Sequence, residues 1–204
     1  GIAHNALLAA EYDIKSETYT WEGGHLHLNN RLDSPTSGIV LASLHPKISK
    51  AVNDLFRQKR VAKDYLAIVK GIPTVKRGDW EDRIAREREN GKIRVAKGGG
   101  GIPARTAFEL LKTSRKTRAL ALLKLTPHTG RTHQLRVQAA LHRFPILGDR
   151  NYGDFGFNRQ FQKETGHKRL FLHAHRISLP VPGSNETFTA ESPMPEEFEM
   201  ALGT

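Results

Sequence analysis

The sequence predicts one α+β domain, residues 1–204, with a largely antiparallel mixed sheet flanked by helices and loops. Its 204 residues, 38% of them apolar, suffice for a single core and fall within the usual size of one domain. Short apolar stretches typical of strands are interspersed with amphipathic segments of helical spacing. No internal repeat and no low-complexity linker divides the chain.

The first half contains a helix between two strand-like stretches. Residues 39–42 are apolar and follow a turn-rich loop. A helix is expected from Pro46 to about Arg60, because proline suits the first helical position and apolar residues recur at helical spacing. These apolar residues are Ile48, Ala51, Val52, Leu55 and Phe56. The run 65–69 is apolar and is followed by Gly71 and Pro73, so it predicts a strand.

The middle of the chain gives weaker signals. Residues 76–105 are rich in Arg, Lys, Glu and Gly, and the tract Gly98–Gly101 suits a flexible hairpin tip or connector. A phosphate-binding loop would require a following Lys-Ser/Thr and a helix, which are absent from the sequence. Residues 106–111 and 118–125 predict two strands, expected to be antiparallel neighbours.

The last third predicts a helix, a strand and a turn. Thr132 is the expected N-cap of the helix, whose apolar stripe contains Val137, Leu141 and Phe144. Residues 170–179 alternate like a half-buried strand that Pro180 would stop, and residues 192–198 are expected to form a surface turn.

The charge of the chain indicates a polyanionic partner. The formal net charge is +11, which favours nucleic acid, since phosphate contacts release counterions. The charge is spread over the chain and no apolar run reaches membrane-spanning length, so we expect no membrane partner. The absence of cysteine excludes disulfides and thiolate chemistry, and with no secretion signal a cytoplasmic location is expected.

Asp33 is the first candidate functional residue. It lies in the segment Asn30-Arg31-Leu32-Asp33-Ser34-Pro35-Thr36-Ser37-Gly38, whose composition predicts a tight loop. A loop on a rigid scaffold is a frequent place for catalytic groups. The carboxylate could instead brace the turn through local hydrogen bonds.

Arg136 is the second candidate, because a cation is unfavourable in the first turns of a helix. A carboxylate opposite the guanidinium would explain this position, since such a pair is strong and keeps the acid ionised. A phosphate contact or a plain surface charge would explain it as well.

Other chemistries have less support in the sequence. The pairs His25/His27 and His173/His175 could each share a strand face, but nothing completes a metal coordination set, so no metal is expected. Ser37 with a distant histidine lacks the glycine-flanked nucleophile elbow of a hydrolase. A second glycosidase-like acid could only be Asp149, whose Gly-Asp turn favours a structural role.

Four segments together resemble the RluA-type pseudouridine synthases, and they occur in the family's order over residues 29 to about 198. Segment 30–38 resembles the family's HRLDxxTSG motif, with Asn30 in place of the usual histidine. The other three segments are 56–71, 130–153 (with GRTHQLRV, PILGD and YG) and 169–174 (RLFLHA). The family's upstream NKPxG strand motif is expected to be missing or truncated, with Gly1-Ile2 as its possible tail.

The resemblance implies a pseudouridine synthase catalytic domain and a role for each matched residue. Asp33 would be the catalytic carboxylate, paired with Arg136, and whether it attacks the ribose or the uracil ring stays open. Tyr65 would stack on the uracil and help to remove the C5 proton. Substrate binding is expected from Arg31, which would fill the space of the flipped nucleotide, and from Leu135, Arg131 and His133.

The expected function is therefore the isomerisation of specific uridines in structured RNA, either ribosomal RNA or tRNA. An isomerisation without redox change implies no cofactor. A catalytically inactive RNA-binding module of the same fold and a metal-dependent nuclease are the alternatives. The sequence indicates neither the target uridine nor the oligomeric state.

Overall fold

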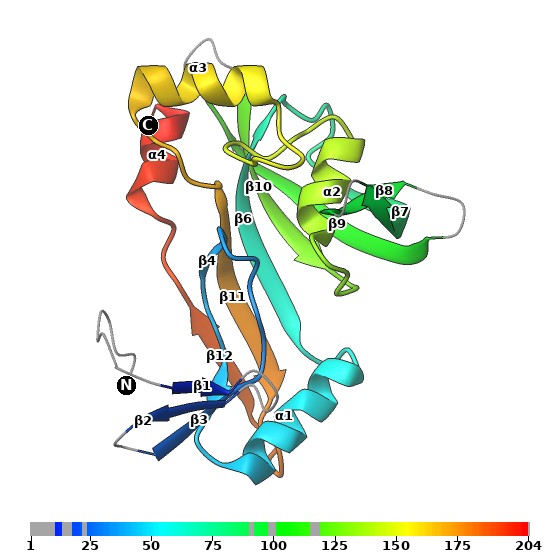
Figure 1. The fold of residues 1–204 in the computed structure, drawn as a ribbon, viewed down its shortest axis with the longest axis vertical. Coiled ribbons are helices and arrows are strands. Elements are labelled where there is room, and N and C mark those ends of the chain that lie inside the picture. Colours follow the sequence, from blue (N-terminus) through cyan, green and yellow to red (C-terminus); the bar gives the residue numbers. More distant parts are fainter. Residues whose placement is uncertain are drawn as a thin grey trace. The chain divides into compact units, whose positions relative to one another are not determined.

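The computed structural model describes residues 11–13, 18–21, 24–89, 92–97, 101–114 and 119–203 (Figure 1). The described residues fall into two compact units. The first takes in those of Gly1–Leu32, Val40–Val61 and Leu179–Phe188, and the second takes in those of Asp33–Ile39, Ala62–Ser178 and Thr189–Thr204. The expected Gly1-Ile2 remnant and Gly98–Gly100 lie outside the described residues.

The first unit contains a four-stranded antiparallel sheet and the helix α1 (Pro46–Arg57). The strands, in sheet order, are β1 (Glu11–Asp13), β2 (Thr18–Trp21), β3 (Gly24–Leu28) and β5 (Ala42–Ser43). The Asn29 amide donates to Ser49 Oγ (3.0 Å) and accepts from Ser43 Oγ (2.5 Å), so it connects α1 with β5. The predicted helix is confirmed and ends three residues before the expected Arg60.

The second unit is built on an eight-stranded sheet of order β12-β11-β6-β10-β9-β7-β8, in which β4 pairs with β11. The strands are β4 (Ser37–Gly38), β6 (Ala62–Lys70), β7 (Arg77–Glu89), β8 (Lys92–Lys97), β9 (Ile102–Thr113), β10 (Leu120–Pro127), β11 (Leu172–Pro180) and β12 (Thr187–Glu191). The pairs β6–β10, β9–β10, β7–β9, β7–β8 and β6–β11 are antiparallel, whereas β4 and β11 are parallel. This agrees with the expected α+β class and largely antiparallel mixed sheet.

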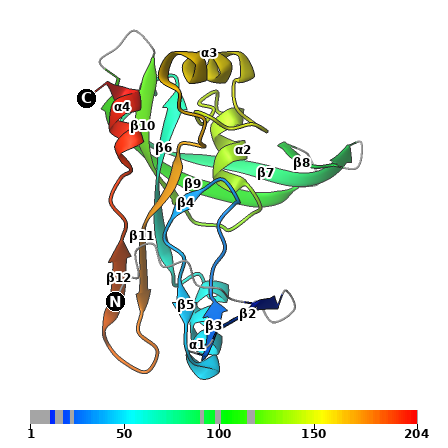
Figure 2. The ribbon, with the colours of Figure 1, turned by 60° about the vertical axis from the view of Figure 1, so that its left-hand side comes forward.

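Three helices cover the two faces of this sheet: α2 (Gln134–Leu141), α3 (Phe155–Thr165) and α4 (Glu196–Leu202). Because successive strand residues point to opposite faces, Ala67 packs with Leu135 of α2, while Ile68 packs with Phe161 of α3 and Phe198 of α4. Figure 2 shows α2 and α4 on opposite sides of β6 and β10. Burial on both faces explains why β6 and β10 have nearly continuous apolar sequences.

Several strand predictions are confirmed, with bounds that are longer for β6 and β9 and shifted by one or two residues for β10 and β11. The strand expected at 65–69 is part of β6, that at 170–179 corresponds to β11, and those at 106–111 and 118–125 correspond to the antiparallel neighbours β9 and β10. The charged segment 76–97 gave no strand signal, yet it contains β7 and β8. Eight residues of β7 pair with β9, from Arg77 to Ile84, so backbone pairing offsets the weak local preference.

Two predictions near helices were wrong. His133, not Thr132, is the N-cap of α2, and it adopts a left-handed backbone with φ 53°. The surface turn expected at 192–198 instead leads into α4, because Phe198 and Leu202 are fully buried against the sheet. Helix α3 was not predicted, although its signals are present: Asp154 accepts a bond from the backbone N–H of Phe157, and Gly166 closes the helix at φ 77°.

Candidate active site

The loop that carries Asp33 is attached to β11. The Asp33 carbonyl accepts the backbone N–H of Thr36 (2.7 Å), which closes the expected turn, and Ile39 N–H donates to the Ala174 carbonyl (3.0 Å). Gly38 adopts φ 111°, and a Cβ there would lie 2.2 Å from the Ala174 oxygen. Only glycine can therefore fit where β4 pairs with β11. Gly38 lies four residues after Ser34 of the turn and five residues after Asp33.

Ser37 gives this loop a second attachment. Its hydroxyl lies 2.9 Å from Nδ1 of His173 and accepts a hydrogen bond from the guanidinium of Arg169. Burial lowers the pKa of His173, so this imidazole is neutral at neutral pH. Ser37 and a distant histidine do meet, as the hydrolase hypothesis required, but the hydroxyl is engaged by Arg169 and serves to anchor the loop.

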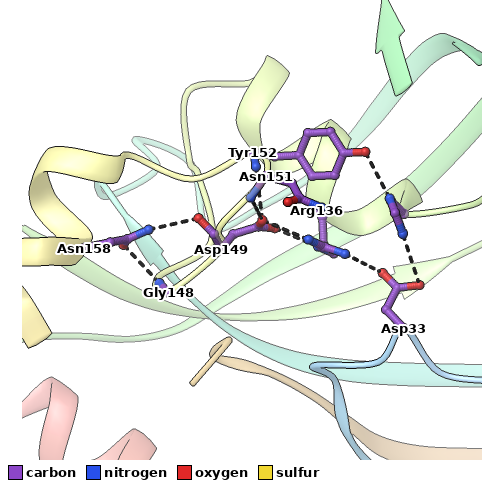
Figure 3. A network of polar contacts seen from close by, with 8 residues as sticks. Asp33, Arg136, Gly148, Asp149, Asn151, Tyr152 and Asn158 are labelled. Carbon is purple, nitrogen blue, oxygen red and sulfur yellow. Dashed lines mark hydrogen bonds and ion pairs between the residues drawn. The ribbon is translucent and has the colours of Figure 1, made fainter. Parts of the chain in front are cut away.

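Arg136 joins Asp33 to a second carboxylate, that of Asp149 (Figure 3). Its Nε and Nη2 donate to the two oxygens of Asp149 at 2.7 and 2.9 Å, and its Nη1 donates to Asp33 Oδ2 at 3.1 Å. The side chains of Arg136 and Asp149 are 4% and 1% exposed, whereas that of Asp33 is 27% exposed. The buried pair thus directs one arm of the guanidinium to a carboxylate that solvent can reach.

Asp149 is held in its ionised form by more than Arg136. Burial alone would raise its pKa, but hydrogen bonds from Arg136 and from the backbone N–H groups of Asn151 and Tyr152 lower the pKa below its ordinary value. Burial would likewise lower the pKa of Arg136, and its bonds to Asp149 and Asp33 raise it instead. Asp149 has the expected structural role, and it is also the residue that orients Arg136.

A histidine and a tyrosine lie beside the same carboxylate. His133 Nε2 is 4.0 Å from Asp33 Oδ1, and its Nδ1 is 3.0 Å from the hydroxyl of Tyr152. The Arg136 guanidinium lies over the Tyr152 ring, 5.2 Å from its centroid. The left-handed backbone of His133 turns the chain into α2 and brings its side chain to this position.

Tyr65 and Leu135 form the apolar side of the site. Tyr65 lies on β6 and packs against the core cluster that contains Leu135, which is 7% exposed. Burial, and secondarily the charge of Asp33, raise the pKa of Tyr65 to about 12, so its phenol is neutral at physiological pH. Leu135 is mainly a core residue in the free protein.

The remaining predicted site residues are more exposed. Arg131 donates from Nε to the Pro103 carbonyl (3.2 Å), and its backbone N–H donates to the Gln134 side chain. Arg31 is an exposed residue of the first unit. Asn30, at the family's usual histidine position, accepts the backbone N–H of Leu41 (2.5 Å) and so stabilises the start of the loop within that unit.

The histidine pairs are engaged in other contacts. In the second unit, His173 contacts Ser37, while His175 Nδ1 lies 2.7 Å from the Ser192 carbonyl. Among the residues that the structure describes, no three His, Asp or Glu side chains are grouped so that they could hold a metal ion. Over the same residues, no helix has the length and apolar character needed to cross a membrane.

The model of the RNA pseudouridylate synthase family matches residues 8–141. The chain belongs to this family. It is 33% identical over 190 residues to the ribosomal large subunit pseudouridine synthase C of Escherichia coli K12, covering 89% of this chain and 56% of that protein. The enzyme of the same name from Pasteurella multocida is 34% identical over 186 residues, 87% of this chain and 54% of its own length. The chain thus spans about half the length of these curated relatives.

Solved structures of the family have the same fold. Human RNA pseudouridylate synthase domain containing 1 superposes with a TM-score of 0.71 at 26% identity, over 82% of this chain and 69% of that chain. Human RNA pseudouridylate synthase domain containing 4 superposes with a TM-score of 0.69 at 28% identity, over 87% and 75%. The expected fold type, that of a pseudouridine synthase catalytic domain, is therefore confirmed.

Sequence reasoning missed the residues that support the catalytic candidates. Arg169 was recognised only as part of the RLFLHA segment, and His173 only there and as one of a possible metal-binding pair, so their role in holding Ser37 was not predicted. Asp149 was considered without Arg136 as its partner, although it lies only 13 residues after Arg136, beyond the end of α2 and one turn. The position of an arginine in the first turns of a helix was the signal that could have indicated a second carboxylate.

Proposed function

We propose that this chain isomerises uridines in ribosomal RNA to pseudouridine, with Asp33 as the catalytic carboxylate. The observation that carries the proposal is a solvent-accessible acid bonded at 3.1 Å to an arginine whose other two donors are held by buried Asp149. Membership of the family supports the reaction. The relatives named for the large ribosomal subunit favour ribosomal RNA over tRNA.

The reaction is an isomerisation and needs neither oxidant nor reductant. The Asp33 carboxylate forms a transient bond to the target nucleotide, and the bond between N1 of uracil and C1′ of the ribose breaks. The base then rotates, C5 bonds to C1′ and the bond to Asp33 breaks, which restores the free carboxylate. The C5 proton leaves and N1 gains a proton, so the atoms balance. A carboxylate nucleophile must be ionised, and the guanidinium of Arg136 favours that form and fixes its orientation.

The target base has to leave its helix before the sugar can be reached, at a cost of a few kcal/mol. Tyr65 would offset part of this by stacking on the uracil, with Leu135 beneath. Arg31 would occupy the vacated space in the RNA, and Arg131 and His133 would contact the backbone near the site. Since the neutral Tyr65 phenol is a weak base, stacking is its main proposed role, and removal of the C5 proton is the second.

Tritium release from RNA labelled at uridine C5 tests the proposal, because the C5 hydrogen is lost only if isomerisation occurs. The parent should release label from bulk ribosomal RNA, whereas Asp33→Asn should release at least about 10⁴-fold less, as expected for loss of a covalent nucleophile. Asp33→Asn should bind the same RNA within about threefold of the parent. Equal release by the two proteins would support an RNA-binding module without activity and would contradict the enzyme proposal.

The choice of substrate is tested by the same assay on separate RNA pools. Label should be released from ribosomal RNA and not from tRNA. Release from tRNA alone would retain Asp33 as the catalytic residue and would overturn the proposed substrate. A nuclease would instead shorten the RNA in an EDTA-sensitive manner.

A further inference from the structure

A pocket in the second unit lies between the turn at Gly148–Arg150 and helix α3. Its volume is about 270 Å³. Small-molecule sites commonly measure about 300–1,000 Å³, so this pocket has room for one ring-sized group and not for a duplex. Its walls include Arg150, Arg159, Lys168, Phe155, Asn158 and Phe171.

The rim of the pocket carries three cations, and the acidic residue in its lining, Asp149, is already paired with Arg136. Arg150, Arg159 and Lys168 are exposed, and within the described part of the chain none of the three forms an ion pair. Some other cations of this unit are paired, such as Lys70 with Asp154 at 2.6 Å. Three uncompensated cations around one opening favour an anion with several oxygens, such as a phosphate.

The floor of the same pocket is aromatic. The side chains of Phe161 and Phe171 are 2% and 0% exposed and meet edge to face, and the ring of His167 lies edge-on to Phe171. Phe155 lines the pocket and is 51% exposed, so its ring is accessible to a bound group. A flat ring placed against Phe155 and His167 would cover apolar surface, and bases stack on such side chains irrespective of sequence.

The pocket shares a wall with the candidate active site. Asn158 lines it and donates to the Asp149 carbonyl (3.0 Å), while its own carbonyl accepts Gly148 N–H (3.0 Å). Figure 3 shows these contacts continuing through the Asp149 carboxylate and Arg136 to Asp33. The polar contacts that orient Arg136 beside Asp33 therefore extend into the wall of this pocket.

We propose that this pocket binds one unpaired nucleotide of the RNA substrate, in addition to the target uridine. The phosphate lies among Arg150, Arg159 and Lys168, and the base stacks against Phe155 and His167. The identification of the occupant as RNA rests on the proposed function, whereas the phosphate-and-ring chemistry comes from the pocket itself.

A single-stranded heptaribonucleotide with central 2-aminopurine tests the pocket, because the fluorescence of this base is quenched on stacking. Binding is measured at several salt concentrations. Each of Arg150→Ala, Arg159→Ala and Lys168→Ala should reduce the salt slope of log K by about 0.7, and the triple variant by about 2, with about tenfold weaker binding at low salt. Phe155→Ala should abolish most of the quenching and leave the salt slope unchanged.

Lys163→Ala is the matched control, since Lys163 is an exposed cation of α3 outside the pocket lining. It should bind within twofold of the parent with an almost unchanged slope. A loss in Lys163→Ala equal to that in Arg159→Ala would indicate diffuse surface charge and overturn the proposal. The proposal would also be overturned if the fluorescence of 2-aminopurine is still quenched by Phe155→Ala. It would likewise be overturned if AMP binds tightly and the heptamer does not displace it.

These measurements are independent of catalysis because they are made in the Asp33→Asn background. If the pocket variants behave as expected but the parent releases no tritium, the proposed function fails and the pocket remains an RNA site. If the parent releases tritium and the pocket variants bind like the parent, only the pocket proposal fails.

Discussion

At the scale of single residues, the candidate site depends on how Arg136 distributes its donors. Two of them bind the buried Asp149, and the third binds the accessible Asp33. Charge-assisted bonds of this kind are about twice as strong as neutral ones, and the bidentate geometry fixes the plane of the guanidinium. Asp149 therefore determines where the cation beside Asp33 lies, although it is itself 1% exposed.

Replacing Arg136 should affect both stability and turnover. Arg136→Ala leaves the Asp149 carboxylate buried without its partner, so the free energy of unfolding should fall by about 3–5 kcal/mol. Turnover should be nearly abolished, while RNA binding stays within a few-fold of the parent as long as the protein is folded. Urea unfolding and tritium release measure the two effects.

The double variant Arg136→Met/Asp149→Asn separates the effect on stability from the effect on turnover. It removes both buried charges and keeps an acceptor for the backbone N–H groups of Asn151 and Tyr152. It should recover most of the lost stability and remain inactive. Parent-like turnover in either variant would exclude Arg136 as the counter-cation of Asp33.

The raised pKa of Tyr65 predicts a loss of stability at high pH. Its folded pKa of about 12 lies above the ordinary value of 10, so the neutral phenol is favoured by folding. The resulting stability is complete below pH 10 and is lost as pH rises from 10 towards 12, and it amounts to roughly 2–3 kcal/mol. The free energy of unfolding of the parent minus that of Tyr65→Phe should therefore fall by this amount as pH rises over this interval. A difference that stays constant would mean that Tyr65 is not buried near a negative charge.

At the scale of elements, the short strand β4 determines the position of the catalytic loop. Its pairing with β11 brings the backbone so close that the site of a Gly38 Cβ lies 2.2 Å from the Ala174 oxygen. Ser37 adds contacts with Arg169 and His173. The TSG and RLFLHA segments thus hold each other in place, and together they fix the position of Asp33.

Gly38→Ala should disrupt this pairing. The added methyl group meets backbone that cannot rotate away, and φ 111° is itself unfavourable for alanine, so we expect a loss of more than about 2 kcal/mol and little turnover. Gly166→Ala is the control, because it has φ 77° and nothing within 4 Å of the added carbon. That change should cost about 1–2 kcal/mol and leave turnover unchanged. Equal effects of the two substitutions in urea unfolding would contradict the close approach.

The elements differ in how well local sequence predicts them. Helix α1 and strand β11 have clear patterns because their burial follows the period of the element, whereas β6 and β10 are recognisable as nearly continuous apolar runs because both of their faces are buried. Helix α4 and strands β7 and β8 have neither pattern, because Phe198 is buried by a distant sheet and charged residues of β7 are held by pairing with β9. The start of α2 was displaced by one residue, since the left-handed His133 has no clear local signal.

At the scale of the whole molecule, the net charge of +11 should govern RNA affinity. If the bound RNA contacts about 6–10 phosphates, affinity should fall by about 10³–10⁵-fold between 50 and 200 mM salt. Filter binding of ribosomal RNA over this range measures the slope. Asp33→Asn should give the same slope, because it changes one group at the reacting centre. A flat salt dependence would exclude phosphate contacts as the source of affinity.

The amino-acid sequence by itself determined the family, the basic character, the loop of Asp33 and the expectation that a carboxylate faces Arg136. These properties are carried by residue types at short spacing. Only the tertiary structure decided that Asp149 holds Arg136, that Arg169 and His173 hold Ser37, and that a basic pocket lies behind the site. Asp33 and Arg136 are 103 residues apart, and Ser37 and His173 are 136 apart. Contacts over such separations depend on how the sheet aligns its strands, which no local pattern specifies.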